Sequence, residues 1–193
     1  EHAMNTITVE KRDFSVKAKH LRKNGYIPGS VFGGPLKESI SLQIDSATVQ
    51  QLMRQKRVGS KLNLSLGGKV IPVQIKETAV NTLNNEIYNI NFQALTADQT
   101  VNSVIHIILK NAEKITACLE RMTSEIPYAS LPEDMIDTIT VDVDGMPVGT
   151  VLTIGDIPEL NTEKIKLRVD KSEIILRISD VKHAGASAEI ISL

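Results

Sequence analysis

Short stretches in which apolar and polar residues alternate, separated by turn-forming residues, run through most of this chain. In the first half they cover residues 6–12, 39–44, 62–66, 69–75 and 86–93, and in the second half residues 101–110, 126–131, 138–143, 150–154, 165–169 and 173–178. Alternation with a period of two is typical of strands that bury one face. The spacing of the second set is that of a β-sandwich. The sequence therefore predicts a mainly β fold with few helices.

Two helices and one tight hairpin are expected in the first half. A basic stretch over 17–23 stops at Asn24-Gly25, which predicts a short helical turn capped by Gly25. Residues 46–57 carry apolar side chains at helical spacing, with Asp45 or Ser46 as the N-cap. Gly67-Gly68 lies between two strand-like runs and predicts a hairpin turn. The Gly- and Pro-rich segment 26–34 is expected to form an exposed, loop-rich region around a short strand.

The charge of the chain separates into two opposite halves. Residues 1–95 carry thirteen Lys and Arg against seven Asp and Glu, whereas residues 96–193 carry nine against sixteen. The halves therefore have net charges of +6 and −7, and such asymmetry is typical of two domains of which one binds a polyanion. We expect a basic, small, six-stranded type of β-barrel over 4–95, an acidic β-rich domain over 96–182 and a flexible tail over 183–193.

Composition argues against a membrane protein and against a disulfide-stabilised one. The longest apolar run, residues 104–109, is far shorter than the roughly 20 residues that span a bilayer. A single cysteine, Cys118, cannot form an internal disulfide, which fits a reducing cytoplasm. A cytoplasmic protein without a membrane partner is expected.

Motifs for catalysis, cofactors or metals are absent from the sequence. There is no phosphate-binding glycine motif, no His-Glu-x-x-His and no Cys-x-x-Cys. The run Asp142-Val-Asp144-Gly145 is interpreted as a turn because the later calcium-ligand positions are apolar or proline. We expect no enzyme, no cofactor and no metal. An enzyme with a site between the domains, using His106, Cys118 and acidic loops, is the remaining alternative.

The residues after the first strand are of the types that bind nucleic acids. Six cations and one histidine fall between residues 11 and 23, opposed only by Asp13: Lys11, Arg12, Lys17, Lys19, His20, Arg22 and Lys23. Cations release counterions when they neutralise phosphates, and the nearby rings of Tyr26 and Phe32 are suited to contact bases or ribose. The alternatives are a solvated basic face and a Phe32 that belongs to the core.

Three phrases of the first half resemble one known family. They are Lys19-His-Leu-Arg22 with Gly25-Tyr-Ile-Pro-Gly-Ser-Val-Phe-Gly33, then Val73-Gln-Ile-Lys-Glu77, and Asn85-Glu-Ile-Tyr-Asn-Ile-Asn-Phe-Gln93. They resemble the ribosomal protein L-twenty-five family. Phrases in 130–134, 140–144 and 148–149 are similar to the β domain of its longer members, called TL-five or general stress protein Ctc. The resemblance implies a component of the large ribosomal subunit that binds 5S ribosomal RNA through its N-terminal domain.

Carried over to this chain, the resemblance implies RNA-binding roles for nine residues. Arg12, Lys17, Lys19, His20, Arg22 and Lys23 would supply positive charge, and Phe32, Asn89 and Asn91 would contact the RNA from the barrel strands.

Several of these positions depart from the family pattern. Family members usually carry Tyr at Phe32, His-x-Asp at Asn89-Ile-Asn91, and Gln and Asp at Ala79 and Asn81. Loss of a charge-assisted contact weakens binding by roughly 1–3 kcal/mol. Three readings remain open: a weakened site, an asparagine network that reads another RNA edge, and ordinary exposed residues. The corresponding alternative function is a ribosome-related stress protein or paralogue that lost 5S RNA binding and serves as a protein-interaction module, with a protein partner for the acidic domain.

Overall fold

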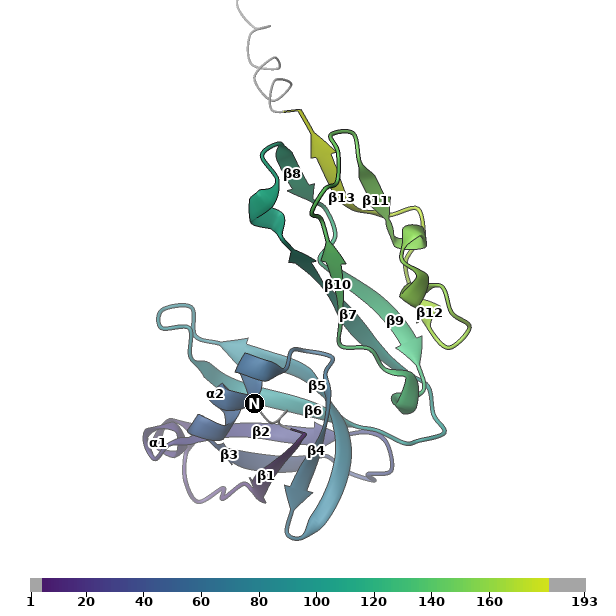
Figure 1. Cartoon of the computed structure of the whole chain (residues 1–193). Helices are drawn as coiled ribbons and strands as arrows, with labels where there is room; N and C mark the ends of the chain where they lie inside the picture. Colours follow the sequence, from purple (N-terminus) through teal and green to yellow (C-terminus); the bar gives the residue numbers. More distant parts are fainter. Residues whose placement is uncertain (1–4, 181–193) are drawn as a thin grey trace, which may run out of the picture. The chain divides into compact units, whose positions relative to one another are not determined.

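The computed structural model describes residues 5–180 and divides into two compact units. Unit 1 contains the residues up to Val101 together with Leu131–Asp137, and unit 2 contains Asn102–Ser130 and the chain from Thr138 onward. Within unit 1, the Lys61 ammonium donates a hydrogen bond of 2.9 Å to the carbonyl oxygen of Pro132. Figure 1 colours the first part of unit 1 from purple to teal and its segment Leu131–Asp137 green. The expected tail over 183–193 lies outside the described residues.

Six strands of unit 1 close into a barrel in the order β1-β3-β2-β6-β5-β4. They are β1 (Thr6–Lys11), β2 (Tyr26–Phe32), β3 (Ile40–Asp45), β4 (Lys61–Leu66), β5 (Lys69–Val80) and β6 (Ile87–Ala94). Closure requires parallel pairing of β1 with β4 and of β2 with β6, while the other neighbours are antiparallel. A closed barrel has no free sheet edge, so every strand is paired on both sides. The predicted mainly β fold with a small six-stranded barrel is confirmed.

Aliphatic side chains fill the barrel interior, and Phe92 is the one aromatic ring among them. Alternation places Ile27 and Val31 of β2, and Ile90 and Phe92 of β6, inward, and these four are almost fully buried. The intervening residues of both strands face outward. The inward alternation therefore fixes which residues of β2 and β6 are presented on the barrel surface.

The segment after Gly25 differs from the expectation of an exposed loop. Tyr26–Phe32 is one continuous strand that pairs with β3 on one side and β6 on the other, and Pro28 and Gly29 are buried within it. A proline lacks the N–H that an interior strand donates, which is why Pro and Gly here suggested a loop. The parallel partner β6 lies about sixty residues away in sequence, so only the fold reveals this pairing.

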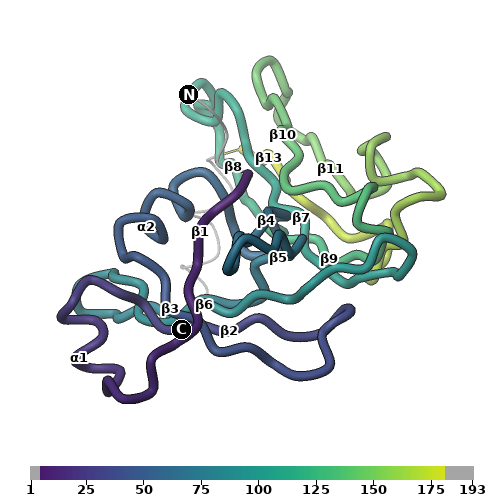
Figure 2. Tube along the Cα trace, turned by 90° about the horizontal axis from the view of Figure 1, so that it is seen from below, coloured from purple at the N-terminus to yellow at the C-terminus, as the bar shows by residue number. Residues whose placement is uncertain are grey.

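Two helices cover the barrel. The helix α1 (Ala18–Lys23) ends at Asn24, and Gly25 follows with φ of +84°, the left-handed geometry expected of a glycine cap. The helix α2 (Ser46–Gln55) buries Val49 and Leu52 against the core. Asp45 occupies its N-cap position, but the side chain makes no capping hydrogen bond. Figures 1 and 2 both place α1 and α2 on the same side of the barrel.

The hairpin between β4 and β5 turns at Gly67-Gly68, as predicted. Both residues have positive φ, +57° and +81°, which is the geometry of the two-residue turns that match strand twist.

The described part of unit 2, up to residue 180, contains seven strands in two sheets. The four-stranded sheet has the order β10-β7-β9-β12 and the three-stranded sheet has the order β11-β13-β8. They are β7 (Val101–Lys110), β8 (Cys118–Arg121), β9 (Glu125–Ser130), β10 (Thr138–Asp142), β11 (Val151–Thr153), β12 (Lys166–Leu167) and β13 (Ile174–Ser179). Six of these match predicted strands, and β8 was missed because its four residues carry no clear alternation.

Short 3₁₀ turns connect the strands of unit 2 at Ala112–Lys114, Ile154–Asp156 and Pro158–Leu160, and a fourth, Pro132–Asp134, belongs to unit 1. At the predicted turn, Asp142 Oδ1 accepts hydrogen bonds from the Asp144 N–H and from Asn111 Nδ2. These contacts lower the pKa of Asp142, the Asn111 amide contributing most. The carboxylate therefore stabilises a turn here.

Candidate nucleic-acid interface

The helix α1 directs its cations away from the barrel. Successive helical residues turn by about 100°, so the buried Leu21 lies opposite Lys19 and Lys23, with His20 and Arg22 on the flanks. Lys17 occupies the N-cap position and is also exposed. The sequence carries no acidic residue in this helix. One short element thus gathers five of the predicted site residues.

Arg22 connects α1 to the strand β6. Its Nε donates a hydrogen bond of 3.2 Å to the carbonyl oxygen of Tyr88, and its guanidinium lies 5.4 Å from the centre of the Tyr88 ring. A planar guanidinium combines such a hydrogen bond with a ring contact, which a lysine ammonium cannot do in the same geometry. The contact holds Arg22 against the strand that carries Asn89 and Asn91.

None of these cations forms an ion pair with any residue in the described range 5–180. The nearest acid in sequence, Asp13, is instead engaged by Ser15, whose hydroxyl and backbone N–H both donate to Asp13 Oδ1 at 2.6 and 2.9 Å. These bonds, the hydroxyl first, lower the pKa of Asp13. The positive charge of α1 is therefore not neutralised by neighbours within this part of the chain.

Arg12 is placed apart from the other predicted residues. It follows β1, its backbone N–H donates to the Ser41 carbonyl, and its guanidinium lies 5.2 Å from the centre of the exposed Phe14 ring. The Arg12 Nε is buried and has no hydrogen-bond partner among the described residues. No hydrogen bond or ion pair joins Arg12 to α1 within residues 5–180.

A polar chain crosses the outer face of three neighbouring barrel strands. The Ser30 hydroxyl on β2 donates to Asn91 Oδ1 on β6 at 2.9 Å, and Asn91 Nδ2 donates to Glu77 Oε1 on β5 at 2.7 Å. These residues are direct register partners, Ser30 with Asn91 and Glu77 with Asn91. Asn91 thus has both sides of its amide occupied, and a carboxylate lies beside it.

The remaining predicted positions lie near this chain or outside it. Phe32 ends β2 on the same outward face as Ser30, half-buried and outside the core cluster, so the core interpretation of Phe32 is wrong. Asn89 lies two residues before Asn91 on β6, beside Ala79. Asn81 belongs to the loop between β5 and β6, where its Oδ1 accepts the Leu83 N–H. The expected asparagine network is therefore centred on Asn91 alone.

A pocket of about 280 Å³ lies beside the Arg22 contact. Its walls come from α1, the start of β2, the N-terminal half of α2 and the two ends of the β5–β6 loop, and they include Tyr26, Gln50 and Glu86. The pocket combines two tyrosine rings, one guanidinium, one carboxylate and amides. This mixture suits a planar, polar ligand.

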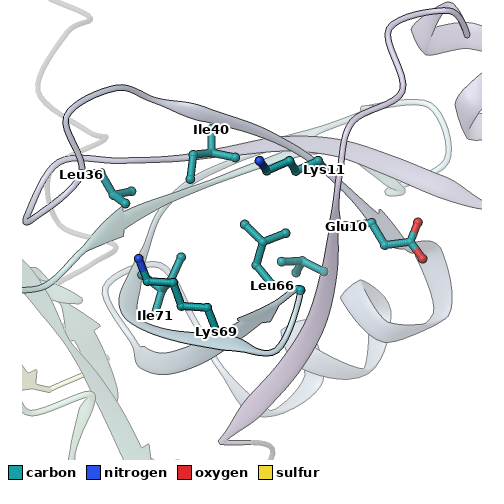
Figure 3. Close-up of a pocket in the computed structure, with 9 residues that line it drawn as sticks. Glu10, Lys11, Leu36, Ile40, Leu66, Lys69 and Ile71 are labelled. Carbon is teal, nitrogen blue, oxygen red and sulfur yellow. The ribbon is translucent and has the colours of Figure 1, made fainter.

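A second and larger pocket, of about 600 Å³, opens at another part of the barrel (Figure 3). Its walls are mostly aliphatic, including Leu36, Ile40 and Leu66, and the stems of Lys11 and Lys69 border it. Figure 3 shows the Glu10 carboxylate directed away from the other labelled side chains. None of the nine predicted residues lines it, which separates it from the candidate interface.

Sequence reasoning missed Ser30, Glu77 and Tyr88 as members of the interface. Ser30 meets Asn91 across 61 residues through parallel pairing, for which the sequence carries no local signal. Glu77 and Asn91 are paired across a β-bulge, which shifts the register that simple alternation predicts. Tyr88 is one and three residues before Asn89 and Asn91, so alternation assigns it to the other face of β6 and no sequence pattern groups it with them.

Within residues 5–180, no group of three or more His, Cys, Asp or Glu side chains is arranged to hold a metal ion. No helix in that range is both long and apolar enough to cross a membrane.

The family models and the similar proteins all indicate the same family. Residues 7–92 match the model of the Ribosomal L25p family, and residues 99–182 match the model of the ribosomal protein TL5 C-terminal domain. Proteins named large ribosomal subunit protein bL25 are similar along nearly the whole length. The one from Caldanaerobacter subterraneus subsp. tengcongensis is 27% identical, covering 96% of both chains. That from Gloeothece citriformis is 26% identical, covering 95% of both.

The relative from Listeria monocytogenes is 22% identical, covering 90% of this chain and 85% of its own. The two family models occur here in the same order as the two expected domains, and the relatives span both of them. The chain, which matches both models in this order, is therefore a member of the ribosomal L25p family in its long, two-domain form.

Proposed function

We propose that this protein is a structural component of the large ribosomal subunit and that its barrel binds 5S ribosomal RNA, without a catalytic role, in the cytoplasm. The relatives that match it end to end are named large-subunit proteins. The observation that carries the RNA assignment is the set of cations on α1, which have no acidic partner among the described residues and which Arg22 connects to β6.

The two parts of the interface would act differently on RNA. Lys17, Lys19 and Lys23 are exposed and have long, flexible side chains, so they would neutralise phosphates and give salt-dependent affinity. Phe32 and Asn89 on the outward strands would meet base or ribose edges, where hydrogen bonds and stacking add specificity. Glu77 opposes RNA binding, because its carboxylate repels phosphate unless a hydrogen-bond donor of a base faces it.

The acidic second half would be repelled by the same RNA. Its net charge of −7 favours protein partners or solvent over the RNA backbone. We assign to it contacts with proteins, as the sequence led us to expect.

Co-sedimentation of the intact chain with large ribosomal subunits tests the proposal. We expect it to travel with the subunits at moderate salt and to bind isolated 5S RNA in filter assays, with affinity falling steeply as salt rises. A salt-independent interaction would overturn phosphate-led binding. A chain that neither sediments nor binds 5S RNA would support the alternative of a paralogue that has left the ribosome.

A further inference from the structure

The pocket beside Arg22 is lined by aromatic side chains, which are rare in this chain. The sequence has three tyrosines, three phenylalanines and no tryptophan, yet two of these six rings, Tyr26 and Tyr88, line this one cavity of about 280 Å³. That volume is slightly below the range of typical small-molecule sites, roughly 300–1,000 Å³. It therefore suits one planar ring system and not a length of chain.

Charged groups of both signs line the pocket without meeting each other. Arg22 uses its Nε for the Tyr88 carbonyl, and its terminal nitrogens form no hydrogen bond or ion pair within the described residues. Glu86 accepts from Asn84 through Oε2 at 2.8 Å and makes no ion pair with Arg22. A ligand between them would have to accept from a guanidinium at one edge and donate to a carboxylate at another.

Guanine is the nucleobase with that distribution of groups. Its O6 and N7 are adjacent acceptors that pair with both arms of an arginine, and its N1–H and N2 amino group are adjacent donors that a carboxylate can accept. The Tyr88 ring, 42% exposed, offers a stacking surface for the base. Uracil lacks the paired donors and has a smaller ring.

We propose that the pocket between α1, α2 and the β5–β6 loop binds an unpaired guanine of RNA, with Arg22 and Glu86 reading its two edges and Tyr88 supporting its face. This inference deepens the proposed function and rests on it for the source of the base. The pocket is separate from the chain Ser30–Asn91–Glu77, whose side chains do not line it. It would add recognition of one unpaired base to the phosphate contacts of α1.

Titration of the intact, ¹⁵N-labelled chain with guanosine and uridine monophosphates tests the pocket directly. We expect amide and Arg22 Nε–H shifts confined to the pocket residues, and binding of the guanine nucleotide about tenfold tighter than that of the uridine nucleotide. Glu86→Gln keeps the size and removes the charge, so it should abolish most of this preference. Glu38→Gln, an exposed carboxylate outside the pocket, is the matched control and should change nothing. Absence of shifts at the pocket with the native chain would overturn the inference.

A short uridine-rich RNA strand with one central guanine separates an RNA ligand from a free nucleotide. If RNA is the ligand, this strand binds more tightly than the mononucleotide, because the α1 cations add phosphate contacts, and the gain disappears at high salt. Equal affinity for both would overturn the assignment to RNA. Failure of the proposed function has a different signature, since guanine binding would then persist in a chain that does not bind 5S RNA.

Discussion

Asn91 and Glu77 face each other across β6 and β5, and the Asn91 amide donates a hydrogen bond of 2.7 Å to Glu77 Oε1. On its other side Asn91 Oδ1 accepts the Ser30 hydroxyl at 2.9 Å. The orientation of the amide is therefore fixed by one donor and one acceptor on opposite sides. An aspartate at this position could accept from Ser30 but would meet Glu77 as a like charge.

Asn91→Asp is accordingly expected to destabilise the protein by about 1 kcal/mol at neutral pH, since like charges directly opposite in a sheet repel. The repulsion raises the pKa of the new carboxyl, so the penalty is present above that pKa and declines as acid protonates it. Chemical denaturation of both proteins at pH 7 and near pH 4 measures the difference. A penalty that does not decrease in acid would contradict this explanation.

The double variant Glu77→Gln with Asn91→Asp is the control for that experiment. It restores one carboxylate and one amide in exchanged positions, so the free energy of unfolding should return close to that of the native protein. In this background, with Phe32→Tyr added, 5S RNA affinity can be measured without the repulsion from Glu77. Tighter binding there would identify the departures from the family pattern as losses of RNA contact.

Gly29→Ala should be among the most damaging substitutions in the barrel. A methyl group at Gly29 would overlap the backbone carbonyl oxygen of Ile90, and a backbone atom of a paired strand cannot move away cheaply. We expect a loss of about 3 kcal/mol or more in the free energy of unfolding, measured by denaturation of the intact chain.

Gly25→Ala is the matched comparison. Gly25 has a positive φ of +84° but open space around its Cβ direction, so only backbone strain of about 1–2 kcal/mol is expected. If both variants cost the same, steric overlap with β6 is not what requires Gly29.

The local elements of the barrel follow from its sequence, whereas the order of its strands does not. Gly67-Gly68 between two alternating runs specified the hairpin, and the glycine after α1 specified where that helix ends. The parallel contact of β2 with β6 instead joins Gly29 to Ile90, and no local pattern records it. Pro28 and Gly29 resembled loop residues because both are common in turns, but Gly29 lies in the strand where a Cβ would overlap the Ile90 carbonyl oxygen.

In the candidate interface, too, local features follow from the sequence whereas long-range contacts do not. The cations of α1 lie within seven residues of one another in sequence, Lys17 to Lys23, and could be grouped without a structure. The partner of Arg22 is a backbone carbonyl on β6, and the partner of Asn91 is an acid on β5 reached across a bulge. Such contacts depend on register, so the sequence identified the residue types but not which of them satisfy one another.

The double variant Lys19→Ala with Lys23→Ala tests the phosphate contacts of α1. Both side chains lie opposite the buried Leu21, so the fold should be unaffected. We expect weaker 5S RNA binding for all RNA sequences and a salt slope reduced by about two, one for each lost contact. The measurement is filter binding over a range of salt concentrations.

Lys69→Ala with Lys76→Ala removes the same charge from exposed positions on β5. If this control lowers the slope equally, the net charge of the barrel drives binding and α1 has no particular role.

Thr153→Val should reduce the part of the stability of unit 2 that is lost when Asp156 is protonated in acid. Asp156 Oδ2 accepts hydrogen bonds from the Thr153 backbone N–H at 2.8 Å and hydroxyl at 3.0 Å, and these bonds, the backbone one first, lower the pKa of Asp156. Because the folded pKa lies below the unfolded one, the associated stability is complete above the unfolded pKa and is lost as pH falls through the folded pKa. Valine removes only the hydroxyl, so the pKa of Asp156 should rise part of the way toward its usual range.

Carboxyl ¹³C titration of the intact chain measures that rise. Asp170 is an internal reference, because its pKa is lowered in the same manner by Ser172, first through the backbone N–H, and Thr153 is not among the groups that shift it. The Asp170 titration should therefore be identical in the two proteins while that of Asp156 moves upward. The stability difference between native protein and variant should also shrink below the pKa of Asp156, where a protonated carboxyl no longer gains from either donor. An unchanged Asp156 titration would show that the backbone N–H alone sets this pKa.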